Sequence, residues 1–195
     1  MSWRKYFKPG LFYRDICRIL GYYFLGFSLT FVIPLLLAAY YQFVARPESH
    51  PQPHSTWAFV GSILVALALS GFFLFFGSRS HGNLFRKEGL TAVVLIWFLT
   101  PFVAALPYYF SGTLTNPVQA YFEACSGLTT TGSTIMHAKL YDPKTGQEIP
   151  YEKSICGIHN TIYEFYGTIT PVGNTEGIEA VNKAILFWRS LTQWL

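Results

Sequence analysis

The chain has 195 residues, of which 51% are hydrophobic, 18% are aromatic and only 12% are charged. This composition excludes an ordinary soluble domain and indicates an all-α membrane protein that crosses the bilayer several times. The formal net charge is only +4, and the Lys and Arg residues cluster beside the apolar segments, where membrane topology accounts for them. We therefore expect membrane lipid, with anionic headgroups, as the counter-charge and no nucleic-acid partner.

The first apolar segment lies between Arg18 and Arg46, a stretch that contains no Asp, Glu, Lys, Arg or His. It is longer than the ~20 residues that span a bilayer. A cleavable signal peptide is the alternative, but the run is too long and no small-x-small cleavage site follows it. We interpret the segment as a retained transmembrane helix, which Pro34 is expected to kink or end.

Two further charge-free runs extend from Ser55 to Ser78 and from Gly89 to Phe110. Residues 19–78 are therefore predicted to form a leading pair of transmembrane helices. The third helix opens a unit that we place at residues 89–134. Pro101 and Pro107 are expected to kink or end this third helix.

The basic residues predict the orientation of the chain. Five basic residues precede the first helix, namely Arg4, Lys5, Lys8, Arg14 and Arg18. Arg46 alone follows it, and Arg79, Arg86 and Lys87 precede the third helix. Because Lys and Arg are enriched in cytoplasmic loops, residues 1–18 are predicted to be a cytoplasmic N-terminus. The protein would then be a multi-pass protein of the inner or plasma membrane, with the third helix running outward.

A short helix is predicted directly after the third span. The pair Asn116-Pro117 is typical of a helix start, and the sequence VQAYFEACSGL then offers about three turns before Gly127 can close the helix. Three turns cannot cross a bilayer, so the chain must return as irregular backbone. Such backbone is tolerated at membrane depth only where protein buries it or where it lines a water-filled cavity. We therefore predict a re-entrant pore helix.

The loop that follows this helix reads LTTTGST from Leu128 to Thr134. Backbone carbonyls in potassium-channel filter loops, which read TVGYG, replace the hydration shell of the ion, and Gly132 can adopt the backbone angles that turn successive carbonyls to one side. A Thr/Ser-rich outer turn is the alternative. We assign ion binding to the backbone carbonyls of Thr130, Thr131, Gly132 and Ser133, with Thr129 and Thr134 in support.

Two ionisable residues accompany this loop. Glu123 lies inside the predicted pore helix, and an intramembrane acid is a functional candidate by default. We assign it to bracing the loop through hydrogen bonds, without contact to the ion. Arg189 stands beside Trp188 and near Trp194, where an unpaired guanidinium would be costly, so that both snorkelling to the interface and a bond to the pore-helix region remain open.

Residues 135–183 carry six acids and four lysines and are predicted to form a small extracellular cap with some β structure. The segment YDPKTGQEIPY has the turn residues of a hairpin, and TIYEFYGTIT alternates like a strand. The acids could concentrate cations at a pore mouth, but the nearly balanced charge favours a plain solvated loop. Residues 184–195 are predicted to be the start of the next transmembrane helix, which is cut short.

Enzymatic and cofactor chemistry find no support in the motifs. GxSxG is absent, and no GK[ST] follows Gly132 to hold a phosphate. Cys17, Cys125 and Cys156 show no CxxC spacing, so we expect no disulfide and no metal site other than the filter. The protein is therefore predicted not to be an enzyme and to need no covalent cofactor.

The segments LPYYFSG, AYFEACSGLTTTGST and LFWRSLTQWL resemble the first membrane-pore-membrane repeat of the Trk/Ktr superfamily of potassium uptake proteins, and most closely the N-terminal part of a Trk-type membrane subunit. The resemblance covers roughly residues 10–134 and 184–195. It implies four repeats around one pore, with K⁺ as the transported ion and with a glycine in each filter loop, here Gly132. It also implies a cytosolic nucleotide-binding regulatory ring as a partner.

The chain reaches Leu195 just as the helix after the loop begins, and one loop cannot surround an ion. We expect either a piece of a longer protein or a unit that assembles into an oligomer with copies of itself or with a separately made remainder. The predicted function is K⁺ uptake through a carbonyl-lined filter. The alternative is a non-conducting membrane fragment or accessory subunit that serves assembly only.

Overall fold

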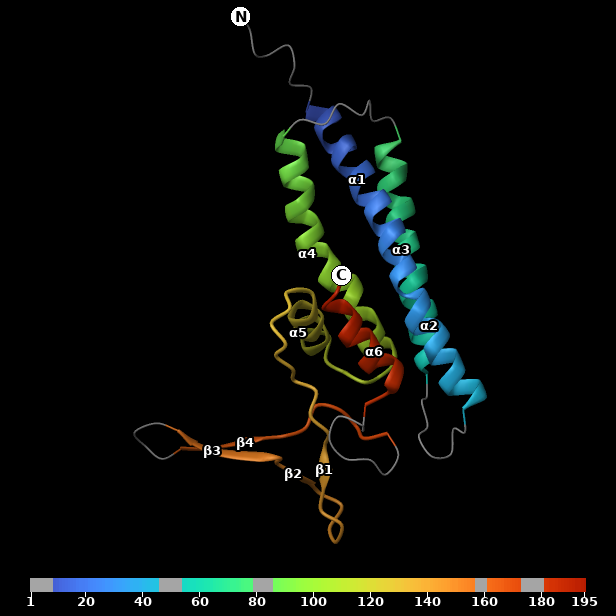
Figure 1. Cartoon of the computed structure of the whole chain (residues 1–195). Helices are drawn as coiled ribbons and strands as arrows, with labels where there is room; N and C mark the ends of the chain where they lie inside the picture. Colours follow the sequence, from blue (N-terminus) through green and yellow to red (C-terminus); the bar gives the residue numbers. More distant parts are fainter. Residues whose placement is uncertain (1–8, 46–53, 79–85, 157–160, 173–180) are drawn as a thin grey trace, which may run out of the picture.

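The computed structural model describes residues 9–45, 54–78, 86–156, 161–172 and 181–195. Within these ranges three helical segments are long and apolar enough to cross a membrane: Tyr13–Val44, Ser55–Gly77 and Arg86–Phe110. The prediction of a mostly helical protein with three helices able to cross a membrane is therefore confirmed (Figure 1). Several residues used in the sequence analysis lie outside the described part, namely Arg4, Lys5, Lys8, Arg46, Arg79 and the side chain of Cys156.

The first span consists of α1 (Pro9–Thr30), α2 (Val32–Ala39) and a short π-helix, η2 (Tyr40–Val44). The α-helix is interrupted at Phe31 because Pro34 has no N–H to donate to the carbonyl of Thr30. Helix α1 begins well before the charge-free run does. Hydropathy locates the part of a helix that lipid can accept, and it does not locate the end of the helix.

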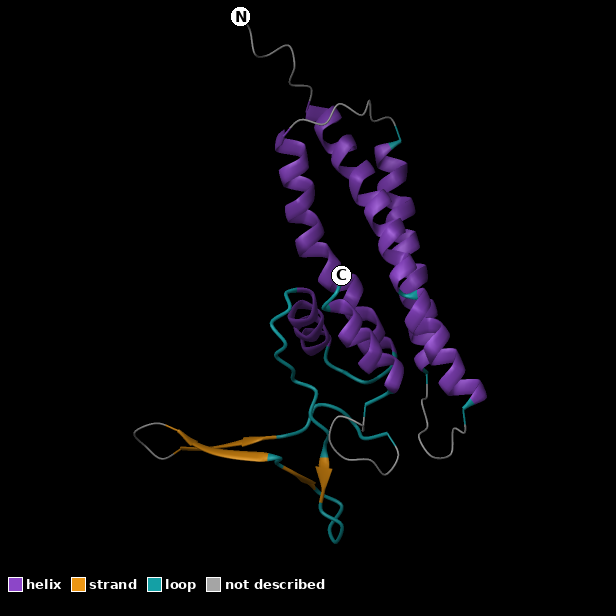
Figure 2. Ribbon diagram, viewed as in Figure 1, coloured by secondary structure: helices purple, strands orange, loops and turns teal. Residues whose placement is uncertain are grey.

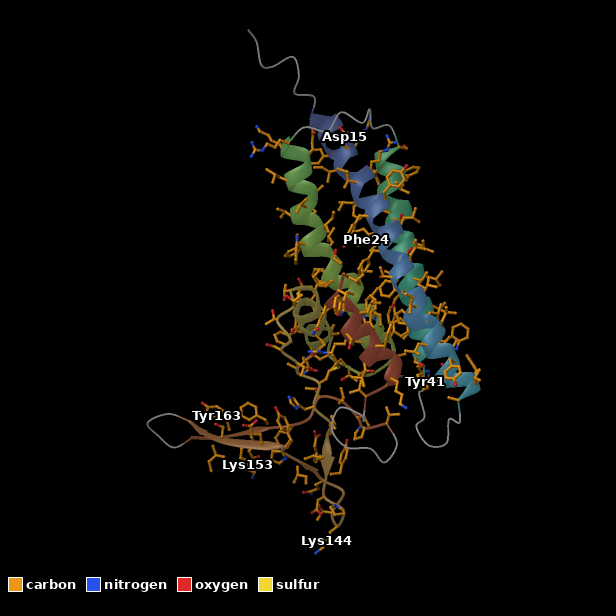
Figure 3. All side chains as sticks on the ribbon, viewed as in Figure 1. Asp15, Phe24, Tyr41, Lys144, Lys153 and Tyr163 are labelled. Carbon is orange, nitrogen blue, oxygen red and sulfur yellow. The ribbon has the colours of Figure 1, made fainter. Side chains whose placement is uncertain are left out.

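Helix α3 (Ser55–Gly77) packs along α1, and α4 (Arg86–Phe110) packs against both of these helices (Figure 1). Small residues allow the first two helices to approach closely, and the Ser70 hydroxyl donates to the Gly21 carbonyl over 2.8 Å. Helix α4 continues through Pro101 and Pro107, so neither proline ends it. Figure 3 shows Phe24, which is fully buried, between the helices.

Gly77 offers a test of the contact between α1 and α3. A Cβ at Gly77 would lie 2.6 Å from the Arg18 nitrogen and 2.8 Å from its Cα, so one backbone would have to move. We expect Gly77→Ala to lower the free energy of unfolding in detergent by about 1–3 kcal/mol, as overpacking does. Gly71→Ala, in the same helix but with open space around the new methyl group, is the matched control. Equal stability of the two variants would contradict the close approach.

Two shorter helices occupy only the half of the bundle away from the N-terminus. These are α5 (Pro117–Leu128) and α6 (Lys183–Thr192). They lie beside the lower part of α4 in Figure 1, with the strands beyond them (Figure 2). The N-terminal end and the strands are therefore at opposite ends of the bundle. The loop after α5 lies at the same end as the strands.

The strands form two separate antiparallel pairs. β1 (Leu140–Tyr141) pairs with β2 (Glu148–Ile149), which is the hairpin predicted from YDPKTGQEIPY. β3 (Glu152–Cys156) pairs with β4 (Thr161–Phe165), and only β4 was expected. Lys144 lies at the tip of the first hairpin, far from the helices (Figure 3).

One ion pair makes the second hairpin sensitive to pH. Lys153 Nζ lies 2.7 Å from Glu164 Oε1, and the Tyr166 hydroxyl also donates to Glu164. The hydrogen bond from Lys153 holds the pKa of Glu164 below its ordinary 4.5, and Glu164 raises the pKa of Lys153 above 10.5. The pair therefore stabilises the hairpin fully at pH values between 4.5 and 10.5. This stabilisation is lost as the pH falls through the folded pKa of Glu164 or rises through that of Lys153.

An NMR titration of the Glu164 carboxyl carbon checks this pairing. We expect a midpoint below 4.5 in the unaltered chain and a shift toward 4.5 in Lys153→Met, because the main donor is then lost. Lys144→Met, at the tip of the other hairpin, serves as a charge-matched control. A midpoint that Lys153→Met leaves in place would count against the ion pair.

Candidate functional site

Helix α5 is capped at its start and too short to cross a bilayer. The Asn116 side chain caps it by accepting from the Val118 N–H over 2.9 Å, and Pro117 fills the first helical position, as predicted. Twelve residues rise ~18 Å, well short of the ~30 Å hydrocarbon core. The helix ends at Leu128. Gly127 does not close it but lies inside it, buried against Thr192 of α6, where a Cβ would stand 3.0 Å from the Thr192 Cβ.

The loop after α5 remains attached to the last helical turn. The N–H groups of Thr130 and Thr131 donate to the carbonyls of Gly127 and Ser126 over 3.0 and 3.1 Å. Thr130 and Gly132 both have positive φ, 56° and 75°, so the backbone turns twice within three residues. The loop side chains from Thr129 to Thr134 are all exposed. One side of the loop is therefore open, and the other faces the protein.

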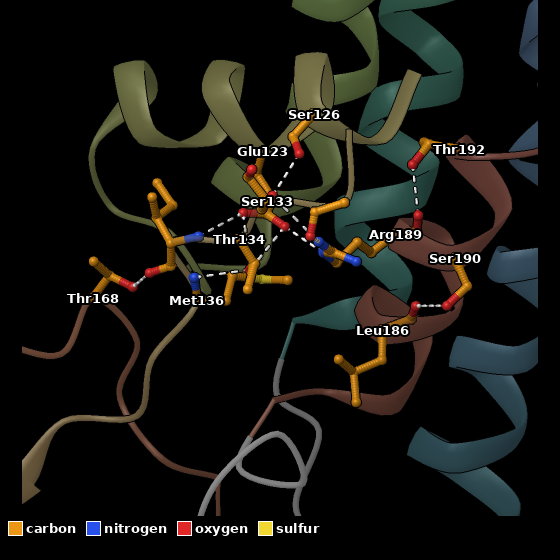
Figure 4. A network of polar contacts seen from close by, with 12 residues as sticks. Glu123, Ser126, Ser133, Thr134, Met136, Thr168, Leu186, Arg189, Ser190 and Thr192 are labelled. Atoms are coloured by element: carbon orange, nitrogen blue, oxygen red, sulfur yellow. Dashed lines mark hydrogen bonds and ion pairs between the residues drawn. The ribbon is translucent and has the colours of Figure 1, made fainter. Parts of the chain in front are cut away.

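Glu123 holds the loop from the protein side (Figure 4). Its carboxylate is fully buried and accepts from the Thr134 hydroxyl at 3.0 and 3.2 Å and from the Ile135 N–H at 3.1 Å. It also forms an ion pair with the Nε of Arg189 on α6. A buried carboxylate with this many donors is satisfied as an acceptor, so Glu123 ties α5, α6 and the end of the loop together.

Arg189 reaches the loop carbonyls with the other end of its guanidinium. Its Nη2 donates to the carbonyls of Gly132 and Ser133 over 3.2 and 3.3 Å, and the Ser126 hydroxyl donates to the Ser133 carbonyl as well (Figure 4). By contrast, the carbonyls of Thr130 and Thr131 accept no hydrogen bond from any described residue. The four carbonyls that we assigned to the ion therefore fall into two pairs with different surroundings.

Trp188 fixes α6 in the position from which Arg189 can act. Its ring is fully buried, and its Nε1 donates to the Ala104 carbonyl of α4 over 3.0 Å. The centre of the Phe31 ring lies 4.5 Å from the centre of the Trp188 ring, and the rings of Phe27 and Phe59 also pack against Trp188. All three earlier spans therefore contribute to the seat of α6, and through it to the position of the Arg189 guanidinium.

Comparison with known proteins finds several relatives, although no protein-family model matches the chain. The Trk system potassium uptake protein TrkH of Salmonella typhimurium is 36% identical over 125 residues, which cover 64% of this chain and 24% of that protein. TrkH of Vibrio parahaemolyticus is 27% identical over 184 residues, which cover 93% of this chain and 28% of that protein. The chain is related to the Trk-type potassium uptake membrane subunits. An uncharacterized cation transporter of Methanocaldococcus jannaschii is 24% identical over 186 residues, 95% of this chain and 25% of that protein.

The Trk-type relatives carry the names of transport proteins, as expected for a chain that is not an enzyme. This chain spans about a quarter of the length of the relatives that it matches. Its membrane character follows both from these relatives and from its three apolar helices.

In this chain the structure brings together all the residues that we assigned to the filter loop and its support. Glu123, Arg189 and the loop from Thr129 to Thr134 form one hydrogen-bonded unit, in which the Thr129 and Thr131 hydroxyls also bond to each other over 2.8 Å. Of the two interpretations of Arg189, the bond to the pore-helix region is the one found. The sequence analysis did not single out Ser126. Ser126 could have been found from its position, because a hydroxyl on the last turn of α5 lies close enough to donate to a carbonyl of the loop that follows.

Proposed function

We propose that this chain contributes one carbonyl-lined filter loop to a protein that takes up K⁺ across the cell membrane. The observation that carries the proposal is the loop from Thr129 to Thr134. It follows a helix too short to span the bilayer, is exposed on one side and is held by buried groups on the other. The names of the Trk-type relatives support K⁺ as the ion.

The ion would exchange its water shell for backbone carbonyls of Thr130, Thr131, Gly132 and Ser133. The first two carbonyls are free to bind it, since no described residue donates to them. The Gly132 carbonyl accepts only from Arg189 among the described residues, and since a carbonyl oxygen has two lone pairs, one remains for the ion. The Ser133 carbonyl accepts from both Arg189 and Ser126, so it would bind the ion in exchange for one of these donors. The inside-negative potential supplies ~2.3 kcal/mol per charge for each 100 mV.

The ion pair between Glu123 and Arg189 would shape the field around the loop. An isolated guanidinium beside the Gly132 and Ser133 carbonyls would repel a cation. The carboxylate of Glu123 is paired with the same guanidinium, so the two charges largely cancel when seen from the ion path. In this proposal Arg189 and Glu123 orient the carbonyls, with Thr134 and Thr129 in support, and none of these side chains contacts the ion.

One such loop encloses no ion, so the pathway would need further loops, from copies of this chain or from additional sequence in the same protein. Residues 1–18 would face the cytoplasm, and residues 135–183, with the β hairpins, would form an outer cap around the pore mouth. A cytosolic nucleotide-binding ring is the regulatory partner that the family resemblance suggests. No covalent cofactor is needed, because the chemistry consists of ligand exchange at K⁺.

A chimera tests this function. The Escherichia coli TrkH protein is 36% identical to this chain over 125 residues. The part of it that corresponds to this chain, including the residues at the position of the loop 129–134, would be replaced by the residues of this chain. The chimera would then be expressed in cells that lack their own K⁺ uptake systems. We expect growth at low K⁺ and Rb⁺ uptake, because the transplanted loop completes a filter. A chimera that lacks the residues corresponding to 129–134 is the matched control.

The competing interpretation is a membrane module that serves assembly only, and the same experiment distinguishes it. A chimera that reaches the membrane in normal amounts yet takes up no K⁺ would overturn the filter assignment. Uptake that persists when residues 129–134 are removed would overturn it as well, since the loop would then contribute nothing to conduction. K⁺ against Na⁺ flux into proteoliposomes that contain the 195-residue chain alone would show whether copies of it assemble into a pathway.

A further inference from the structure

A groove runs between α1 and α3 at the end of the bundle that carries the N-terminus. Tyr13, Arg14 and Cys17 of α1 line one wall, and Phe72 and Phe76 of α3 line the other, around a volume of about 390 Å³. It lies at the opposite end of the chain from the filter loop and the strands (Figure 1). The groove therefore plays no part in the ion path proposed above.

The shape of the groove follows from the close approach of the two helices. Their backbones nearly touch at Gly77 and Arg18, where there is no room for a Cβ on the glycine. The groove lies between larger side chains of the same two helices, which form its walls. The ring centres of Phe72 and Phe76 lie 4.8 Å apart, and the two residues are 56% and 53% exposed. A continuous aromatic surface therefore faces outward.

Arg14 gives this apolar groove a single positive charge. It is exposed, and it forms no ion pair or hydrogen bond with a described residue. The nearby Arg18 is already engaged, since its guanidinium lies 5.9 Å from the centre of the Tyr22 ring. A ligand of the groove would therefore meet aromatic rings along its length and one available guanidinium at its rim.

We propose that the groove binds an anionic phospholipid, with an acyl chain along Cys17, Phe72 and Phe76 and the phosphate at Arg14. A purely apolar occupant would leave the guanidinium without a counter-charge, and a soluble anion would leave the aromatic walls exposed. A phospholipid satisfies both. The end of an apolar helix is also where an arginine side chain reaches the headgroup region of a bilayer.

Cys17 supplies a reporter inside the groove. In a variant that carries Cys125→Ala and Cys156→Ser, Cys17 is the remaining cysteine, and its rate of reaction with a maleimide measures access to the groove. The protein would be placed in nanodiscs of phosphatidylcholine with increasing amounts of phosphatidylglycerol. We expect phosphatidylglycerol to slow the labelling. Arg14→Gln should reduce this protection about fivefold, the effect of one basic residue at an anionic membrane surface.

Two matched variants separate this site from general effects. Arg86→Gln removes an exposed arginine at the same end of the bundle, on α4, and should leave the protection unchanged. Phe76→Ala should release phosphatidylglycerol in native mass spectrometry, whereas Phe75→Ala, its more exposed neighbour, should not. Equal protection by both lipids, equal loss in the two arginine variants, or a Cys17 already shielded in lipid-free detergent would each overturn the proposal.

Discussion

Replacing Arg189 with leucine is expected to lower the free energy of unfolding by about 3–5 kcal/mol, the usual cost of removing one partner of a buried ion pair. The variant leaves the Glu123 carboxylate fully buried without its cation. It also removes the donor from the carbonyls of Gly132 and Ser133, so the loop loses part of its support. Reversible unfolding of the purified chain in mild detergent, followed by tryptophan fluorescence, measures the change.

A double variant shows whether the cost comes from the unpaired charge. Glu123→Gln together with Arg189→Leu leaves no buried charge, and the amide oxygen can still accept from Thr134 and Ile135. We expect the double variant to recover most of the lost stability. Arg86→Leu, which removes an exposed arginine, should change stability by less than about 0.5 kcal/mol. A double variant as unstable as Arg189→Leu would contradict the role of the ion pair.

The second large effect concerns ion selectivity. Gly132→Ser in the chimera is expected to reduce the preference for K⁺ over Na⁺ by about 5–30-fold, the factor that corresponds to 1–2 kcal/mol. A left-handed backbone conformation costs a residue with a Cβ about this much, and Gly132 has a φ of 75°. A Cβ at this position would meet no atom within 4 Å. The strain therefore arises in the backbone and changes the direction of the carbonyls.

Gly112→Ser is the matched control for this experiment. Gly112 has a φ of 73° and equally open surroundings, but it lies in the turn between α4 and α5, outside the filter loop. We expect both serine variants to lose similar stability while only Gly132→Ser loses selectivity, as measured by competition between Rb⁺ and Na⁺ in uptake. Unchanged selectivity in Gly132→Ser, with normal amounts of protein in the membrane, would remove Gly132 from the filter.

Much of the fold was predictable because lipid imposes strict local rules. A charge-free run of sufficient length forms a helix in a bilayer, and this locates three spans with little ambiguity. The start of α5 at Asn116 and Pro117 was predictable for a similar reason, since capping depends on two adjacent residues. The end of α5 was less predictable, because Gly127 serves its contact with Thr192 of α6 and not the local chain.

The pairing of Glu123 with Arg189 lies beyond such local rules. Sequence reasoning showed that each residue needed a partner, but 66 residues separate them, and only the packing of α6 decides the outcome. Strand β3 was missed because its apolar and polar residues do not alternate clearly, and its pairing with β4 completes it. The groove at Arg14 was equally hidden, because it depends on how closely two helices approach each other.

The separation of Glu123 and Arg189 along the chain also has a consequence for synthesis. A ribosome that adds about 5–20 residues per second needs roughly 3–13 s to reach Arg189 after Glu123. During this interval α5 and its loop are already made, but the carboxylate has no guanidinium and Trp188 has not yet reached its seat. We therefore expect the loop to take its final conformation only after α6 emerges, and until then Glu123 needs water or the insertion machinery to accommodate its charge.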